Sequence, residues 1–281
     1  MIKEIVEKTL LAAHASLARL GPTGLTPKEK NRFGETCLQA DWECEEAVIS
    51  YLRRENFAAR IISEEHGAID LTPNPFYTCI LDGLDGTRQY QADRKKGIYG
   101  TILGIFHGLD PHYNDYAAGG AIIHSQNTLI TYVKNEGVDV CRQMLTKNHY
   151  NIPPLIVDSL SELVSRQRPI FVDEPWEANQ IAFVKPLEKR GYTISDLGSS
   201  TASYTAIALG EADLVLECTR KDNLEIAAFY GLITELQGLM VTLDGQPLGE
   251  QKYTKFGQKD HIPVITCTNK SLLYDLLWTI T

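Results

Sequence analysis

Apolar positions in the first part of the chain recur every three to four residues. This spacing predicts a helix over 2–20, ended by Gly21 and Pro22, and a second helix over about 37–55 with Asp41 in its first turns. Short apolar runs then predict strands, and the turn signals between them favour an antiparallel sheet. The predicted strands cover 60–63, 77–81, 97–106, 117–124, 129–133 and 138–141.

After about residue 148 the pattern changes to alternating helices and strands. Helices are predicted over 160–166, 177–190, 199–210, 223–237 and 270–281, and strands over 170–172, 212–217 and 263–266. We therefore divide the chain into an N-terminal part over 1–142 and a C-terminal α/β part over 143–281. No Ser/Gly-rich linker separates them, so we expect the two parts to pack closely.

The composition of the chain argues against some classes of partner and indicates the cellular compartment. The 281 residues are 43% hydrophobic and carry a formal charge of −9 without a basic stripe, which argues against nucleic acid as a partner. No run of about 18 apolar residues and no signal-peptide pattern appears, so we expect no membrane insertion. Six scattered cysteines without a Cys-x-x-Cys pair indicate reduced, mostly buried thiols and a cytoplasmic protein.

The most informative segment covers 82–87 and consists of Asp-Gly-Leu-Asp-Gly-Thr, directly after the predicted strand 77–81. Burying Asp82 and Asp85 so close together costs several kcal/mol unless a cation compensates their charges. Carboxylate and carbonyl oxygens are the ligands that Mg²⁺ prefers. The segment therefore favours a metal site, while a surface Asp-Gly turn between strands remains the alternative.

Further acidic residues stand at the ends of other predicted elements. Glu64 and Glu65 follow the strand 60–63, Asp41 lies near the start of a helix, and Glu225 follows the start of another. Each has an ordinary alternative role, as a solvated strand end, a first-turn acid that stabilises the helix dipole, or a neighbour of a helix cap. Their combination with Asp82 and Asp85 favours one shared site.

These segments resemble the inositol monophosphatase / fructose-1,6-bisphosphatase superfamily of metal-dependent, lithium-sensitive phosphatases. Segment 82–87 is similar to its Asp-Pro-Ile-Asp-Gly-Thr signature, and 62–65 is similar to its Glu-Glu segment. The resemblance covers roughly 30–106 and 195–275. It implies a five-layered αβαβα sandwich of the α/β (α+β) class, with the active site in the crevice between the two parts.

The resemblance also implies residue roles. Glu64, Asp82 and the Leu84 carbonyl would hold one Mg²⁺, and Asp82, Asp85 and Glu225 would hold a second. Asp41 and Thr87 would orient and deprotonate the attacking water. The substrate would contact a further set: Gly86, Thr87, Arg88, Ser199, Ser200 and Glu217.

The implied protein is a homodimer that hydrolyses a small phosphorylated metabolite, with Mn²⁺ as a substitute ion and Li⁺ as an inhibitor. Inositol phosphate, fructose bisphosphate, an adenosine bisphosphate nucleotide and another small sugar phosphate all remain open as substrates. Three positions depart from the family pattern: Gly83 replaces proline, Arg88 replaces a small polar residue, and Glu225 replaces aspartate. A catalytically weak or inactive member that binds metal or sugar phosphate is therefore the alternative.

Overall fold

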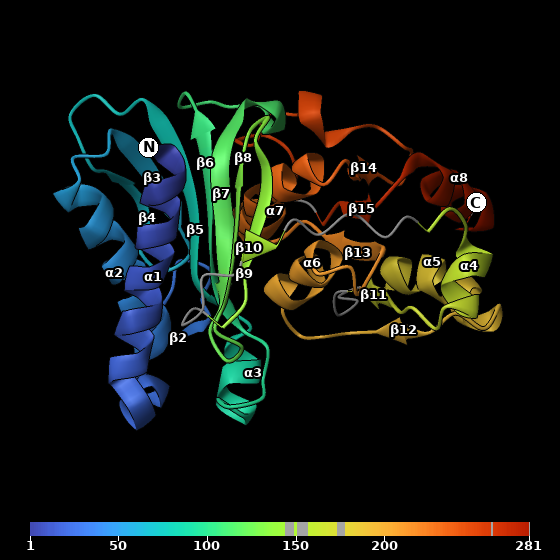
Figure 1. The fold of residues 1–281 in the computed structure, drawn as a ribbon, viewed down its shortest axis with the longest axis horizontal. Coiled ribbons are helices and arrows are strands. Elements are labelled where there is room, and N and C mark those ends of the chain that lie inside the picture. Colours follow the sequence, from blue (N-terminus) through green and yellow to red (C-terminus); the bar gives the residue numbers. More distant parts are fainter. Residues whose placement is uncertain (144–148, 151–156, 173–177, 260, 281) are drawn as a thin grey trace.

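Helices and sheets alternate in five layers along the long axis of the molecule (Figure 1). The computed structural model describes residues 1–143, 149–150, 157–172, 178–259 and 261–280. The predicted αβαβα sandwich is confirmed. Three hydrophobic cores fill the spaces between the layers.

The first layer consists of α1 (Ile2–Leu20) and α2 (Gln39–Arg54), which cover one face of the large sheet. The buried stripe of α1 includes Val6, Leu10 and Leu17, at the helical spacing visible in the sequence. The helix predicted from residue 37 begins at Gln39 instead, because β2 (Thr36–Leu38) pairs with β1 (Pro27–Lys30) immediately before it.

The second layer is an eight-stranded sheet in the order β10-β9-β8-β7-β6-β5-β3-β4. Its strands are β3 (Ala59–Ser63), β4 (Gly67–Asp70), β5 (Tyr77–Asp85), β6 (Gly100–His107), β7 (Tyr116–Ile123), β8 (Thr128–Val133), β9 (Gly137–Cys141) and β10 (His149–Tyr150). All neighbours are antiparallel, as predicted, except β3 and β5, which run parallel.

The parallel pair β3–β5 has a direct consequence for the site. Ser63 at the end of β3 lies opposite Leu81 of β5. Parallel strands end at the same edge of a sheet. Glu64 therefore follows β3 beside Asp82 of β5, and two acidic segments separated in sequence converge.

The third layer consists of α6 (Ser200–Ala208) and α7 (Leu224–Glu235) between the two sheets. Both helices are buried on nearly all sides. A helix enclosed by two sheets has no solvent face, which explains why α7 is mostly apolar and α6 carries no charged residue. A short irregular turn, Lys221–Asn223, leads into α7.

A mixed five-stranded sheet and three outer helices complete the fold. The sheet order is β12 (Ile194–Ser195), β11 (Ile170–Val172), β13 (Leu214–Cys218), β15 (Pro263–Cys267) and β14 (Leu239–Thr242). The outer layer contains α4 (Leu160–Ser165), α5 (Ala178–Lys189) and α8 (Lys270–Ile280). The predicted end residues 177 and 281 lie outside the described residues.

Several short elements were not predicted: β4, β12, β14 and α3 (Thr87–Ala92). None is longer than six residues, so none shows enough periods of an apolar pattern to be distinguished from a loop. All six cysteines are free and five of them are buried, as expected. Within the described ranges, no helix combines the length and apolar character needed to traverse a bilayer.

Candidate active site

Strand β5 carries both aspartates of the signature segment inside the sheet. The predicted strand ended at residue 81, but β5 continues to Asp85 with a register irregularity between Asp82 and Asp85. A bulge at this position changes the direction of a side chain without ending the strand. Both carboxylates are buried, with 5% of Asp82 and 6% of Asp85 exposed.

Gly83 is required by close packing. A Cβ atom at this position would lie 2.5 Å from the Asp41 carbonyl oxygen and 2.6 Å from Glu45 Cγ. Any larger residue, proline included, would push β5 away from α2. In this chain the departure from the family's proline therefore permits tight contact between the strand and the helix that carries Asp41.

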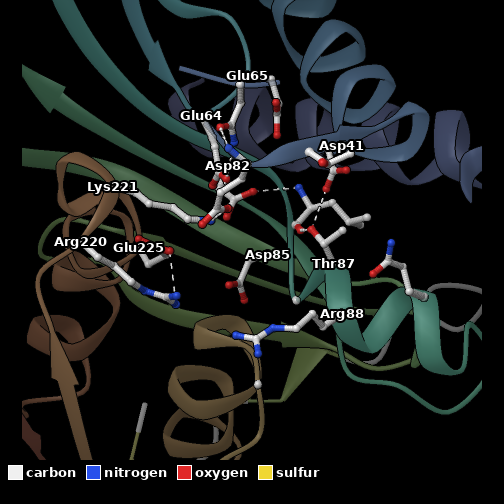
Figure 2. A pocket seen from close by; sticks show the side chains of 17 residues that line it. Asp41, Glu64, Glu65, Asp82, Asp85, Thr87, Arg88, Arg220, Lys221 and Glu225 are labelled. Atoms are coloured by element: carbon white, nitrogen blue, oxygen red, sulfur yellow. Dashed lines mark hydrogen bonds and ion pairs between the residues drawn. The ribbon is translucent and has the colours of Figure 1, made fainter. Parts of the chain in front are cut away.

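Asp82, Asp85 and Glu225 form a buried carboxylate triad at the floor of the site (Figure 2). One oxygen of each lies within 4.8 Å of the others. Burial, and then the charges of Glu64, Asp85 and Glu225, raise the pKa of Asp82 well above its usual value. Burial raises the pKa of Glu225 to about 7 against the opposing effect of Arg220.

The triad fits a hard divalent cation. It offers only oxygen donors, and the raised pKa values of Asp82 and Glu225 indicate that these two carboxylates favour proton uptake when no cation balances the buried charge. Glu225 reaches the group although it is longer than the aspartate of the family pattern.

Asp41 and Thr87 form a hydrogen-bonded pair on the side of the cavity away from Glu225 (Figure 2). Thr87 Oγ1 lies 2.7 Å from Asp41 Oδ1 and 3.0 Å from the Leu84 carbonyl oxygen. Asp41 Oδ2 accepts the Leu38 N–H at 2.6 Å, which fixes the carboxylate at the start of α2. Burial raises the pKa of Asp41 to about 7, although the hydrogen bond from Thr87 opposes the rise.

Glu64 is held by two donors. Its Oε1 accepts from Asn31 Nδ2 at 3.0 Å and from Lys221 Nζ at 2.8 Å. Burial raises the pKa of Glu64, and the Lys221 charge counteracts that rise. Lys221 also contacts Glu35 Oε2 at 2.6 Å.

Asp85 connects the two parts of the chain. Its Oδ2 accepts from Ser199 Oγ at 2.5 Å and from the Thr201 N–H at 2.6 Å, and its Oδ1 accepts the Ser200 N–H at 3.3 Å. The carboxylate therefore occupies the N-terminus of α6, where backbone N–H groups and the helix dipole favour negative charge.

The turn before α7 carries two cations into the site. Lys221, Asp222 and Asn223 are consecutive residues with φ of 46°, 55° and 61°. A left-handed conformation costs roughly 1–2 kcal/mol for each non-glycine residue. Arg220, directly before them, lies 3.5 Å from Glu225 Oε1 and 3.9 Å from Glu217 Oε1.

These groups enclose a cavity of about 350 Å³. Its acidic lining residues are Glu35, Asp41, Glu64, Glu65, Asp82, Asp85 and Glu225. Its cationic lining residues are Arg88, Arg220 and Lys221. Leu84, Gly86 and Thr87 also line it, so the structure brings most of the predicted site residues together.

Ser199, Ser200 and Glu217 do not line this cavity. The Ser199 hydroxyl is bonded to Asp85, and the Ser200 hydroxyl donates to Glu217 Oε1 at 2.6 Å. The three residues surround a much smaller adjacent space of about 10 Å³. Their contact with substrate stays a prediction.

Two walls face each other across the cavity (Figure 2). We define the N-terminal wall as Asp41, Glu64, Asp82, Asp85 and Thr87. We define the C-terminal wall as Arg220, Lys221 and Glu225.

Glu45, which was not among the predicted site residues, positions the Glu64 segment. This fully buried carboxylate accepts the backbone N–H groups of Glu64 at 3.0 Å, Glu65 at 3.2 Å and His66 at 3.2 Å. Its Oε2 also lies 2.8 Å from His66 Nδ1. The available signal was an acid on the same helical face as Asp41 and the buried Val48.

The inward direction of Arg220 and Lys221 was not predicted either. The run Arg-Lys-Asp-Asn has the composition of an exposed turn. Asp222 and Asn223 belong to the residue types that adopt left-handed conformations most readily after glycine, but the sequence does not specify three such residues in succession.

Comparison with known proteins identifies the family. The sequence model of the inositol monophosphatase family matches residues 4–277. The chain belongs to this family. Its members are metal-dependent phosphatases that act on small phosphorylated metabolites, so this chain is a phosphoric monoester hydrolase.

Individual relatives have low sequence identity to this chain, but the matches cover most of both chains. The inositol-1-monophosphatase of Aeropyrum pernix is 23% identical over 219 residues, which cover 76% of this chain and 75% of the relative. The solved fructose-1,6-bisphosphatase of Leishmania major has a TM-score of 0.73 at 17% identity, covering 99% of this chain and 92% of that one. The extragenic suppressor protein suhB of Bartonella henselae has a TM-score of 0.71 at 16% identity, with 99% and 97% covered. At these identities the two solved structures establish the fold alone.

Proposed function

We propose that this phosphatase is Mg²⁺-dependent and hydrolyses a small phosphomonoester by direct attack of water. One observation carries the proposal: the Asp82–Asp85–Glu225 triad and the Asp41–Thr87 pair line the same cavity. A divalent ion on the triad supplies the Lewis acidity and positive charge that phosphoryl transfer needs.

Asp41 and Thr87 have the geometry of a proton-accepting pair. As Thr87 Oγ1 takes a proton from water, its own proton passes to Asp41 Oδ1 along their 2.7 Å hydrogen bond. A general base is most effective when its pKa lies near the working pH, and Asp41 has a pKa of about 7. The hydrogen bond from Leu38 N–H keeps the carboxylate in place during the transfer.

The charge of the cavity supports metal dependence. Its seven acidic residues outnumber its three cationic residues, so a phosphate group meets net repulsion when no cation is bound. Arg88 is one of the three cations, and its planar guanidinium matches phosphate oxygens in a two-point contact. We propose that Arg88 binds the substrate phosphate or, in a bisphosphate, its second phosphate.

The size of the cavity supports a small substrate. About 350 Å³ is at the lower end of the range for small-molecule sites, and the lining is predominantly polar. Inositol phosphate, fructose bisphosphate and adenosine bisphosphate all remain candidates. We further propose that Mn²⁺ replaces Mg²⁺, that Li⁺ inhibits, and that the protein is a cytoplasmic homodimer.

A phosphate-release screen over these three substrate classes tests the proposal. The full chain is assayed with millimolar Mg²⁺, with Mn²⁺ and with a chelator. We expect release from at least one class with Mg²⁺ and none with the chelator. Absence of release from every class in Mg²⁺ would favour a non-catalytic member of the family, and undiminished release in the chelator would refute metal dependence.

A further inference from the structure

The Lys221 ammonium lies among acids that belong to the proposed metal site. Lys221 Nζ is 2.8 Å from Glu64 Oε1 and 2.6 Å from Glu35 Oε2. Only 18% of the Lys221 side chain and 9% of the Glu64 side chain are exposed. The pair is therefore largely shielded from water, where opposite charges attract far more strongly than at the surface.

The position of Lys221 is imposed by the turn that carries it. Three consecutive left-handed residues persist only where surrounding contacts determine them. Asp222 forms an ion pair with Arg32, and Gln258 Nε2 donates to the Asp222 carbonyl oxygen at 3.0 Å. The Asn223 side chain donates to the Tyr113 hydroxyl. The turn is thus anchored on both sides.

The ammonium and a metal ion would compete for the same charge. Glu64 Oε1 already accepts from Lys221 and Asn31. A divalent ion bound to that oxygen would face the ammonium across one atom, and two cations so placed repel strongly. Figure 2 shows Lys221 extending from the C-terminal wall toward Glu64 and Asp82, while Asp85, the other aspartate of the triad, lies on the side away from Glu64. Arg220 lies 3.5 Å from Glu225 Oε1, farther than Lys221 Nζ lies from Glu64 Oε1. The triad therefore fits a metal better than the Glu64 side does while Lys221 is in place.

We propose that Lys221 is a tethered cation that replaces the metal ion expected at Glu64 and Asp82, so that the chain holds one divalent ion, on Asp82, Asp85 and Glu225. The inference rests on the proposed metal-dependent function and assigns a positioning role to a residue outside the recognised signature. Removal of the Lys221 charge makes Glu64 available as a ligand for a second ion.

Mn²⁺ binding to the chelator-stripped full chain tests the proposal without turnover. Calorimetry gives the number of ions per chain, and electron paramagnetic resonance detects spin coupling between two ions about 3.5–4 Å apart. We expect one ion without coupling in the wild type and in Lys221→Arg. We expect two coupled ions in Lys221→Met, which keeps a long side chain without the charge. Two ions in the wild type, or one in folded Lys221→Met, would overturn the proposal.

Glu64→Gln provides a second test that does not depend on the folding of the lysine variant. If Lys221 has replaced the metal at Glu64, this substitution leaves the Mn²⁺ stoichiometry at one and its affinity within about twofold. A tenfold or larger loss of affinity, equivalent to about 1.4 kcal/mol, would identify Glu64 as a metal ligand in the wild type and refute the proposal.

The proposed phosphatase activity and the proposed role of Lys221 can be refuted independently of each other. Phosphate release is measured on the same wild-type preparation as Mn²⁺ binding. One bound ion without release from any substrate would refute phosphatase activity and leave the role of Lys221 supported. Release together with two bound ions would support the activity and overturn the role of Lys221.

Discussion

The two walls of the cavity hold their side chains in place by different means. The N-terminal wall is built on regular elements: Asp82 and Asp85 belong to β5, and Asp41 is fixed in the first turn of α2. In the C-terminal wall, Arg220 and Lys221 lie on an irregular turn ahead of α7. A strand or helix fixes a side chain through its own hydrogen bonds, whereas the turn depends on contacts with Arg32, Tyr113 and Gln258.

The walls also differ in charge. The N-terminal wall contains carboxylates and one hydroxyl, while the C-terminal wall combines Glu225 with two cations. The first wall follows the family signature and the second departs from it. A site can therefore keep its reacting groups on one side while the opposite side changes how their charge is balanced.

The largest expected effect concerns the N-terminal wall. Asp41→Asn should lower kcat about 10²–10⁴-fold, because an amide does not accept the proton passed by Thr87. The far-ultraviolet circular dichroism and melting temperature should show that the variant remains folded. Steady-state phosphate release measures kcat.

Glu43→Gln on the same helix provides the control, since Glu43 is bonded to Gln39 and does not line the cavity. Its kcat should equal that of the wild type. A folded Asp41→Asn variant with near wild-type kcat would remove Asp41 from the proposed mechanism.

The next effect concerns the C-terminal wall. Glu225→Gln should weaken Mn²⁺ binding by at least the roughly 10–100-fold seen when a partner of a metal ligand is lost. The reason is that the triad loses one of its three charged oxygens. Calorimetric titration measures the affinity. Glu211→Gln, at an exposed position, should bind as the wild type does. Unchanged affinity in Glu225→Gln would place the ion on the N-terminal wall alone.

A smaller effect is expected for the support of the N-terminal wall. Glu45→Ala should lower the free energy of unfolding by about 1–3 kcal/mol, because the Glu64 and Glu65 N–H groups lose their acceptor, while the His66 N–H keeps Ser63 Oγ. Denaturant titration of the metal-free protein measures the change. Glu46→Ala, with a side chain 44% exposed, should have little effect. Equal stability of the two variants would show that water replaces Glu45 at these amides.

The smallest expected effect is a pH dependence of stability, to which each wall contributes one carboxyl group. Asp41 and Glu225 have folded-state pKa values of about 7, above the roughly 4 of an unfolded carboxyl, so the native state binds more protons between these limits. The stability of the chelated protein should therefore fall as pH rises from about 5 to 8. Scanning calorimetry should show a lower melting temperature at pH 8, and Mg²⁺ should reduce the decrease.

Asp41→Asn and Glu225→Gln should each remove part of the pH dependence of the melting temperature. The size of each part gives the contribution of the N-terminal and of the C-terminal wall. A melting temperature that stays level or rises between pH 5 and 8 in chelator would contradict the raised pKa values.

Most of the fold was predictable because its long elements repeat their apolar pattern several times. Helix α1 matches the predicted 2–20 in full, and the six strands predicted in the first part all occur. The parallel pairing of β3 with β5 was not predictable, since local turn signals do not specify which strands become neighbours. The continuation of β5 to Asp85 was missed because glycine and aspartate are rare within strands.

The residues of the site also differ in how far the sequence could predict them. The acidic groups were predictable because carboxylates at the ends of apolar runs are unusual. Lys221 was not, because its direction depends on three backbone angles and on contacts with Arg32 and Tyr113, which are about a hundred or more residues away in sequence.

The double attachment of Asp85 constrains how this protein can change over generations. The same carboxylate belongs to the triad and fastens α6 to the sheet through three hydrogen bonds. A descendant that abandoned phosphate chemistry would still need this acid to keep its halves joined. Substitution of Asp85 alone would remove a carboxylate of the triad and also the hydrogen bonds that attach α6 to the sheet. Two independent requirements therefore keep an acid at this position. Survival of Asp85 in a relative is therefore no guarantee that the relative is an enzyme.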